Sequence, residues 1–105
     1  MTVQSKSEPD GSITLTVLVK TLDRSNAANF REAVGRVITP DTRRVTVDCS
    51  SVDFMDSSGV GALLHTQNLL SESRRPILLA NVVPRVFIAL ELMQVHRVFN
   101  LEPAK

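Results

Sequence analysis

The chain has 105 residues, enough for one domain with its own hydrophobic core but not for two. Hydrophobic residues make up 43% of it and charged residues 22%, ordinary globular values that exclude a disordered, collagen-like or coiled-coil class. The net charge of +1 provides no overall basic field, so nucleic acid is not an expected partner, although Arg43-Arg44 and Arg74-Arg75 form two local basic pairs.

Cys49 is the only cysteine, so an internal disulfide is impossible, and no Cys and His residues cluster with the spacing of a structural zinc site. The first ten residues are polar and lack the apolar segment of an export signal. No stretch approaches the ~20 apolar residues that cross a bilayer. We therefore expect a cytoplasmic chain that does not insert into membranes and uses no metal or cofactor.

The first part of the chain predicts a β-hairpin. Residues 2–5 form a short strand candidate, and Asp10-Gly11 is a turn signal. After the turn, hydrophobic and polar residues alternate, which is typical of a strand with one buried face. The hydrophobic positions are Ile13, Leu15, Val17 and Val19.

From Ser25 the hydrophobic period changes from two to that of a helix, with Phe30, Val34, Val37 and Ile38 on one face. Asp23 or Ser25 is expected to cap this helix, and Pro40 to end it. Gly35 lies inside the predicted helix, where it costs about 1 kcal/mol relative to Ala.

The remaining segments alternate between strand and helix. They are a strand at 44–49, a helix from about 60 to 73, a strand at 77–80, a helix opening at Pro84 and an edge strand at 98–99. Two strands followed by helix, strand, helix, strand and helix predict a single α/β domain, with a mixed sheet of four to five strands and helices packed against it.

Polar and small residues gather between the second predicted helix and the strand before it, in the run Asp56-Ser57-Ser58-Gly59 followed by Gly61. The N-terminus of a helix offers free backbone N–H groups and a partial positive charge, so it accommodates a phosphate. A serine here can be exposed and modified. These residue types also favour turns and helix caps without further function, and from physical chemistry alone that explanation is the commoner one.

Enzymatic alternatives fit less well. A serine hydrolase would use a Gly-x-Ser-x-Gly elbow, but Met55 stands two residues before Ser57, and His65 lies two helical turns further on. An acceptor aspartate at Asp53 or Asp56 lacks an acidic pair near the first strand. No phosphate-cradling or dinucleotide-binding glycine motif occurs. The chain is therefore not expected to be an enzyme.

The segment from Val52 to Gly61 resembles the signature of the STAS domain, specifically that of the anti-sigma factor antagonists. Leu22-Asp23, the helix at Pro84 and the closing Arg97-Val98-Phe99 fall where that family has similar features. The resemblance covers about residues 13–99.

This resemblance implies that Ser57 is phosphorylated by a partner that is both anti-sigma factor and serine kinase. The unphosphorylated protein would bind that partner and release a sigma factor in bacterial transcription regulation, and a PP2C-type phosphatase would reverse the modification. By the same resemblance Asp23, Asp56, Ser57, Ser58 and Gly59 form the partner-binding site. Asp56 presents Ser57, and Gly59 and Gly61 permit close helix packing.

Three departures from the family pattern stand at Lys20-Thr21, at Val83 before Pro84, and at Gln94 in place of a helix-ending Gly. Two other functions stay open. The chain could be a STAS scaffold or accessory subunit of a stressosome-like or lipid-transport complex, or the fold could bind a nucleotide at the Ser57 junction.

Overall fold

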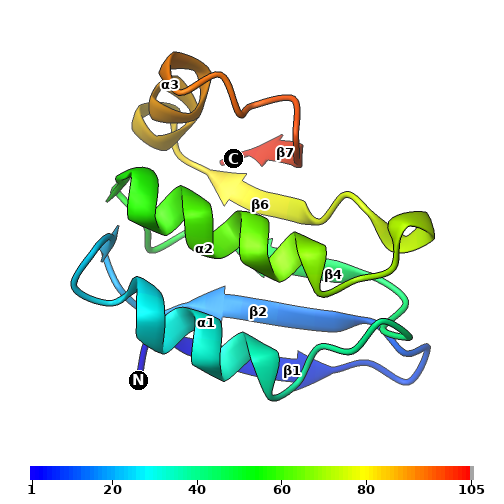
Figure 1. The fold of residues 1–105 in the computed structure, drawn as a ribbon. Coiled ribbons are helices and arrows are strands. Elements are labelled where there is room, and N and C mark those ends of the chain that lie inside the picture. Colours follow the sequence, from blue (N-terminus) through cyan, green and yellow to red (C-terminus); the bar gives the residue numbers. More distant parts are fainter. Residues whose placement is uncertain (105) are drawn as a thin grey trace.

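The computed structural model describes residues 1–104, whose main feature is a five-stranded sheet (Figure 1). The strand order is β1-β2-β4-β6-β7. The β1–β2 pair is antiparallel and the other pairs in this sheet are parallel. The predicted α/β fold with a mixed sheet is confirmed. The strands are β1 (Val3–Ser7), β2 (Ile13–Val17), β4 (Val45–Asp48), β6 (Leu78–Val82) and β7 (Asn100–Pro103).

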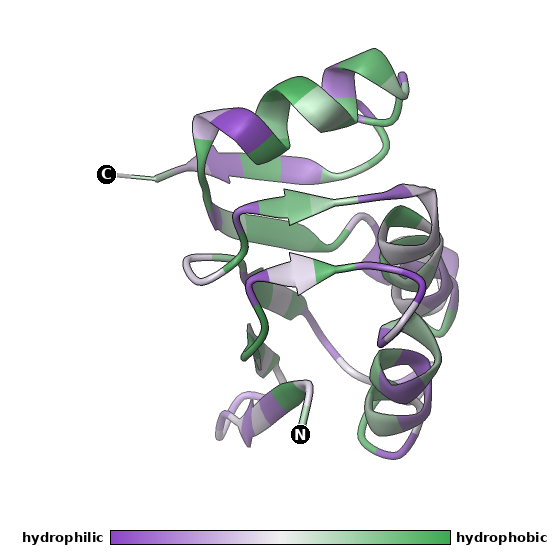
Figure 2. Cartoon of the chain, turned by 90° about the vertical axis from the view of Figure 1, so that its left-hand side faces the viewer, coloured by the Kyte–Doolittle hydropathy of each residue, from purple (hydrophilic) through white to green (hydrophobic). Residues whose placement is uncertain are grey.

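Two helices, α1 and α2, lie side by side over one face of the sheet, while α3 lies beside its β6–β7 edge (Figures 1 and 2). None of the helices in residues 1–104 combines the length and apolar character that crossing a bilayer requires. The helices are α1 (Ala27–Gly35), α2 (Ser57–Asn68) and α3 (Pro84–Leu92), and a 3₁₀ turn, η1, spans Glu72–Arg74.

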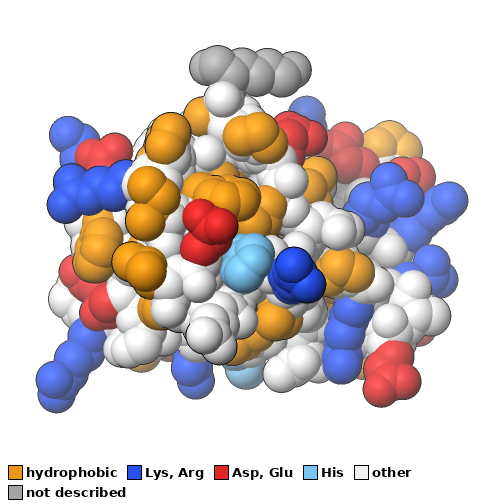
Figure 3. All heavy atoms as spheres, turned by 90° about the horizontal axis from the view of Figure 1, so that it is seen from above, with side chains coloured by type: hydrophobic (Ala, Val, Ile, Leu, Met, Phe, Trp, Pro, Cys, Tyr) orange, Lys and Arg blue, Asp and Glu red, His pale blue; other side chains and the backbone are white. Residues whose placement is uncertain are grey.

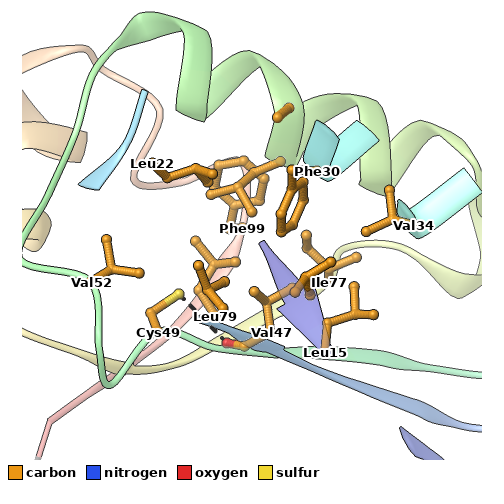
Figure 4. Packing of buried hydrophobic residues seen from close by; sticks show 14 of the residues in the cluster. Leu15, Leu22, Phe30, Val34, Val47, Cys49, Val52, Ile77, Leu79 and Phe99 are labelled. Atoms are coloured by element: carbon orange, nitrogen blue, oxygen red, sulfur yellow. Dashed lines mark hydrogen bonds between the residues drawn. The ribbon is translucent and has the colours of Figure 1, made fainter. Parts of the chain in front are cut away.

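The core lies between the sheet and the two helices. Along β2 every second residue is buried, and the parallel register places Leu15 beside Val47 on the helix-covered face. Phe30 and Val34 of α1 lie over these strands, and Leu79 of β6 lies beside Val47 (Figure 4). All five side chains are fully buried, which stabilises the fold by about 1.5–3 kcal/mol for each.

A second, two-stranded sheet pairs β3 (Thr21–Leu22) with β5 (Phe54–Met55) in parallel, with Leu22 opposite Met55. The sequence did not predict these strands, because two residues are too few to show alternation. The pair matters for function, since β5 leads directly into α2.

The start of α1 differs from the prediction. Its N-cap is Asn26, whose side chain makes no capping hydrogen bond, so the expected cap at Asp23 or Ser25 is wrong. The Asp23 carboxylate instead accepts the Ser25 N–H (2.9 Å), which forms a turn before the helix. Gly35 ends the helix, well before Pro40, so it carries no helix-interior cost.

The later elements also shift. The helix α2 ends at Asn68 rather than near Ser73, and the last strand begins at Asn100 rather than at Val98. Phe99, expected in that strand, inserts its side chain into the core with only 4% exposed, and pairing with β6 starts one residue later.

Gln67 of α2 is a buried polar residue whose side chain has a structural role. Its side-chain oxygen accepts the Ile77 N–H (3.0 Å) and its side-chain nitrogen donates to the Val98 carbonyl (3.1 Å). Buried Gln67 thereby satisfies two backbone groups, one just before β6 and one just before β7, that strand pairing leaves without a partner.

Candidate functional site

Ser57 is the first residue of α2, and the paired strands β3 and β5 position it. Because the two strands are parallel and in register at Leu22 and Met55, the next residues, Asp23 and Asp56, leave the same edge of the small sheet. The structure therefore brings together two aspartates that are 33 positions apart in the chain.

Asp56 joins the loop after β3 to the start of α2. It is the N-cap residue, and its Oδ1 accepts the Gly59 N–H (3.0 Å). Its Oδ2 accepts the Arg24 N–H (3.3 Å), and its own N–H donates to the Leu22 carbonyl (3.3 Å). The first turn of α2 is thus held from both sides, which fixes the direction in which Ser57 leaves the helix.

Asp23 is half-buried, and the hydrogen bonds that it accepts come from residues of its own turn. Its carboxylate accepts hydrogen bonds from the N–H and hydroxyl of Ser25 (2.9 and 2.5 Å), and its carbonyl accepts the N–H groups of Asn26 and Ala27. Within residues 1–104 no hydrogen bond joins Asp23 to Ser57. Asp23 is therefore a neighbour on the same surface and not a direct ligand of the hydroxyl.

The other expected site residues differ in their exposure to solvent. Ser57 is exposed, Ser58 is half-buried, and Gly59 is buried. A Cβ atom at position 59 would stand 2.1 Å from the Leu22 carbonyl oxygen, so only glycine allows α2 to approach β3 this closely. At Gly61 a Cβ would meet only the tip of the Arg31 side chain, at 3.2 Å, so close packing there does not require glycine as strictly.

An apolar surface adjoins this turn. Phe54, in β5, is 40% exposed, and the Arg85 guanidinium of α3 lies over its ring at 5.8 Å from the centroid. Ile88 and Leu92, one turn apart on α3, are 54% and 80% exposed. Figure 3 looks onto this end of the molecule, where hydrophobic side chains gather beside charged ones. The sequence did not predict this surface, because β5 has only two residues, exposed Phe54 and buried Met55, and shows no alternation.

The start of α2 presents an exposed serine hydroxyl. In residues 1–104 no group of three or more His, Cys, Asp or Glu side chains could hold a metal ion. The described hydrogen bonds connect neither His65 nor any carboxylate to the Ser57 hydroxyl, so the turn shows no base for a serine nucleophile. An exposed hydroxyl at a helix N-terminus is chemically suited to carry a phosphoryl group.

Comparison with known proteins agrees with this geometry. The STAS domain family model matches residues 6–105. The comparison with curated protein sequences found no match.

Three solved structures share the fold at low sequence identity. The first is an anti-sigma factor antagonist from Mycobacterium paratuberculosis, 22% identical, with a TM-score of 0.81 and coverage of 97% of this chain and 85% of that one. The second is an anti-sigma-factor antagonist (STAS) domain protein from Planctomyces limnophilus, 17% identical, with a TM-score of 0.78 and coverage of 98% and 91%. The third is the Bacillus cell fate determinant SpoIIAA in its phosphorylated form, 20% identical, with a TM-score of 0.63 and coverage of 94% and 89%. The structural likeness shows the fold, the family model covers nearly all of the sequence, and the chain belongs to the STAS domain family.

Proposed function

We propose that this chain is an anti-sigma factor antagonist whose partner binding is switched by phosphorylation of Ser57. The unphosphorylated form binds an anti-sigma factor with serine kinase activity and so releases a sigma factor. Phosphorylation ends the binding, and a PP2C-type phosphatase restores it. The chain is then a kinase substrate without catalytic activity of its own. The observation that carries the proposal is the exposed Ser57 on the first turn of α2 in a STAS fold.

The accessibility of Ser57 supports a role as phosphate acceptor. Its side chain is exposed and makes no hydrogen bond within residues 1–104, so a kinase can take the hydroxyl without first breaking an internal contact. SpoIIAA, which shares the fold, exists in a phosphorylated form. The exposed hydroxyl of Ser57 at the start of α2 is the acceptor that we propose in this chain.

The electrostatics of the turn explain how one modification can change binding while leaving the fold intact. A phosphoserine adds about −1.5 to −2 charges at neutral pH. The N-terminus of α2 contributes about +0.5 of an elementary charge, which stabilises the phosphoserine locally. The added charge exceeds what the helix end compensates, on a surface that carries Asp23 and Asp56 as well as the cations Arg24 and Arg85. A partner surface fitted to the neutral hydroxyl is repelled.

The apolar surface beside Ser57 supports binding of a protein partner. Phe54 stands three residues before Ser57, and α3 with exposed Ile88 and Leu92 packs beside β5. Exposed apolar side chains gathered next to polar ones are typical of protein interfaces. In this arrangement Asp23, Ser57 and the apolar side chains contact the partner, and buried Gly59 shapes the surface from below.

The experiment compares immobilised wild type with Ser57→Ala, Ser57→Asp and the matched control Ser7→Asp, which adds the same charge at the exposed end of β1, outside the proposed binding site. Each is exposed to lysate of the source organism. We expect wild type, Ser57→Ala and the control to retain a kinase-related protein that Ser57→Asp does not. Equal retention by all variants contradicts the switch and supports the scaffold or accessory function. Circular dichroism of each variant establishes that it is folded.

A second measurement addresses the chemistry. Incubation of the captured partner with this chain and ATP should add one phosphoryl group, which peptide mapping locates at Ser57. The chain with ATP alone should remain unmodified. Modification of Ser57→Ala to the same extent as wild type would contradict the assignment of the acceptor.

A further inference from the structure

The two arginine pairs singled out in the sequence come together in one open pocket of about 460 Å³. The function proposed for Ser57 does not use this pocket. Its lining consists of four arginines together with small, polar and apolar residues. These are Arg43, Arg44, Arg74 and Arg75 with Ser73, Pro76, Leu78 and Asn100.

Sheet topology explains why the pairs meet. Arg43-Arg44 immediately precedes β4 and Arg74-Arg75 immediately precedes Pro76 and β6, and β4 and β6 are neighbouring parallel strands. Parallel strands begin at the same edge of a sheet, so both pairs project from that edge. Figure 1 shows the loops before β4 and β6 at the right-hand side and the start of α2 at the left.

The pocket carries a net positive charge. A nearby carboxylate is that of exposed Asp10, whose pKa is lowered by hydrogen bonds from Ser12 and, to a smaller extent, by the charge of Arg43. None of its lining residues is acidic. Among residues 1–104 the one ion pair joins Glu32 of α1 to Arg36, the residue after that helix, so none of the four guanidinium groups forms a salt bridge with a carboxylate. Four like charges around one concavity repel each other, and a bound anion relieves that repulsion.

Part of the pocket is already ordered for binding. Arg75 donates from Nε to the Leu70 carbonyl (3.0 Å) and from a terminal nitrogen to the Asn68 carbonyl (3.3 Å), beyond the end of α2. These bonds hold the half-buried guanidinium against the protein. A preorganised guanidinium loses less conformational entropy when it binds a planar or tetrahedral anion than a free side chain does.

The lining also indicates the class of anion. The volume lies in the range of small-molecule sites, and four guanidinium groups exceed what one phosphate needs. No aromatic side chain lines the pocket, and its apolar part is limited to Pro76 and Leu78, so no aromatic ring there stacks on a nucleobase. We propose that this arginine pocket binds an anion with two or more linked phosphoryl groups, recognised through its phosphates.

The pocket is independent of the phosphorylation switch. Ser57 begins α2 and Arg75 contacts carbonyls at its far end, and a helix of 12 residues is about 18 Å long. Binding at the arginine pocket is therefore expected in both the Ser57→Ala and the Ser57→Asp variant. Failure of the partner-switching proposal would leave it unaffected.

The test is isothermal titration of the full chain with tripolyphosphate, orthophosphate and ATP at low and physiological salt. We expect saturable binding of tripolyphosphate that weakens as salt increases, and about tenfold or more weaker binding of orthophosphate. ATP should bind no more tightly than tripolyphosphate. ATP binding tenfold more tightly would show that the base is recognised and would overturn recognition through phosphates alone.

Variants locate the site. Arg75→Gln should weaken tripolyphosphate binding about tenfold, and the double variant Arg43→Gln/Arg74→Gln, which alters only exposed side chains, should weaken it further. Arg24→Gln is the matched control, because it removes one positive charge from the exposed residue whose backbone N–H bonds to Asp56, at the other end of α2. Absence of binding by wild type overturns the proposal. So does weaker binding by Arg24→Gln with wild-type binding by the other two variants, which would place the anion at the Ser57 turn.

Discussion

Gly59 lies against the carbonyl of Leu22 so closely that a Cβ atom at position 59 would stand 2.1 Å from that oxygen. The same oxygen accepts the N–H of Asp56 at 3.3 Å. A backbone contact between β3 and the first turn of α2 therefore sets the position of the turn that carries Ser57.

This contact predicts opposite effects at two glycines of one helix. Gly59→Ala should lower the free energy of unfolding by about 1–3 kcal/mol or more, since the added methyl forces the backbone apart. Gly61→Ala meets only the Arg31 side-chain tip, so it should be neutral or stabilise by up to about 1 kcal/mol. Urea denaturation monitored by circular dichroism measures both. Equal stability of the two variants would contradict the close approach.

The cap at Asp56 gives a second prediction. Asp56→Ala removes the oxygen that accepts the Gly59 N–H and should cost about 1 kcal/mol of stability. Asp56→Asn keeps an accepting oxygen and should cost much less. Urea midpoints for the two variants provide the comparison, and an Ala variant as stable as wild type would show that the cap contributes nothing.

Gln67 should be hard to replace. Gln67→Met is similar in size but leaves the Ile77 N–H and the Val98 carbonyl without partners, and each such loss costs about 1–3 kcal/mol. Asn68→Ala, at the exposed neighbouring position, should change stability by less than about 0.5 kcal/mol. Thermal denaturation of the two variants tests the contrast. A stable Gln67→Met protein would mean that water satisfies both backbone groups.

The Cys49 thiol should be unreactive in the folded protein. Desolvation by burial, followed by the nearby charge of Asp48, raises the pKa of Cys49 from 9.0 to about 12. The thiol, which donates to the Val47 carbonyl (Figure 4), therefore stays protonated at pH 8. Iodoacetamide should modify it only after unfolding, as mass spectrometry would show. Rapid modification of the native protein would contradict this burial.

The same shift has a consequence for stability. Because the pKa is raised in the folded state, the contribution of Cys49 is fully present below about pH 9 and decreases as the pH rises towards 12. Cys49→Ala should lack this part of the alkaline decrease. Urea denaturation of both proteins across this pH range provides the measurement, and identical alkaline profiles would contradict the assignment.

Gln94 stands where the family pattern has glycine, and the structure shows its cost. Its φ of 59° lies in the left-handed region, and it closes α3 as the N–H of Val95 bonds to the Leu90 carbonyl (3.0 Å). Gln94→Gly should stabilise the protein by about 0.5–1 kcal/mol, measured as a higher Tm. Gln94→Ala keeps a Cβ and should gain nothing. A lower Tm for the Gly variant would contradict the prediction.

The elements that the sequence predicted well are those with a repeated hydrophobic pattern. The alternation along β2 and the helical face of Phe30 and Val34 each repeat often enough to identify the element and its buried side. The β3–β5 pair escaped prediction because each strand has two residues and a partner some thirty positions away. The one sequence feature that could have indicated this pairing is that Leu22 and Met55 are both followed by aspartate.

The candidate site divides in the same way. Local residue types at positions 56–59 predict a polar turn that opens a helix, since capping depends on neighbours within one turn. The contact of Asp56 with the Arg24 N–H, the approach of Gly59 to Leu22 and the exposed apolar surface of Phe54, Ile88 and Leu92 depend on segments distant in the chain.

The sequence by itself therefore determined the fold class and the order of the long elements, which follow from periodicity and from capping chemistry acting over one or two turns of chain. The resemblance of residues 52–61 to the STAS signature indicated Ser57 as the residue to examine. Tertiary structure alone decided which segments meet at Ser57 and that two distant arginine pairs share one pocket. Parallel pairing of strands across long crossovers brings such residues together, and the residue pattern within one segment does not show which distant segment will pair with it.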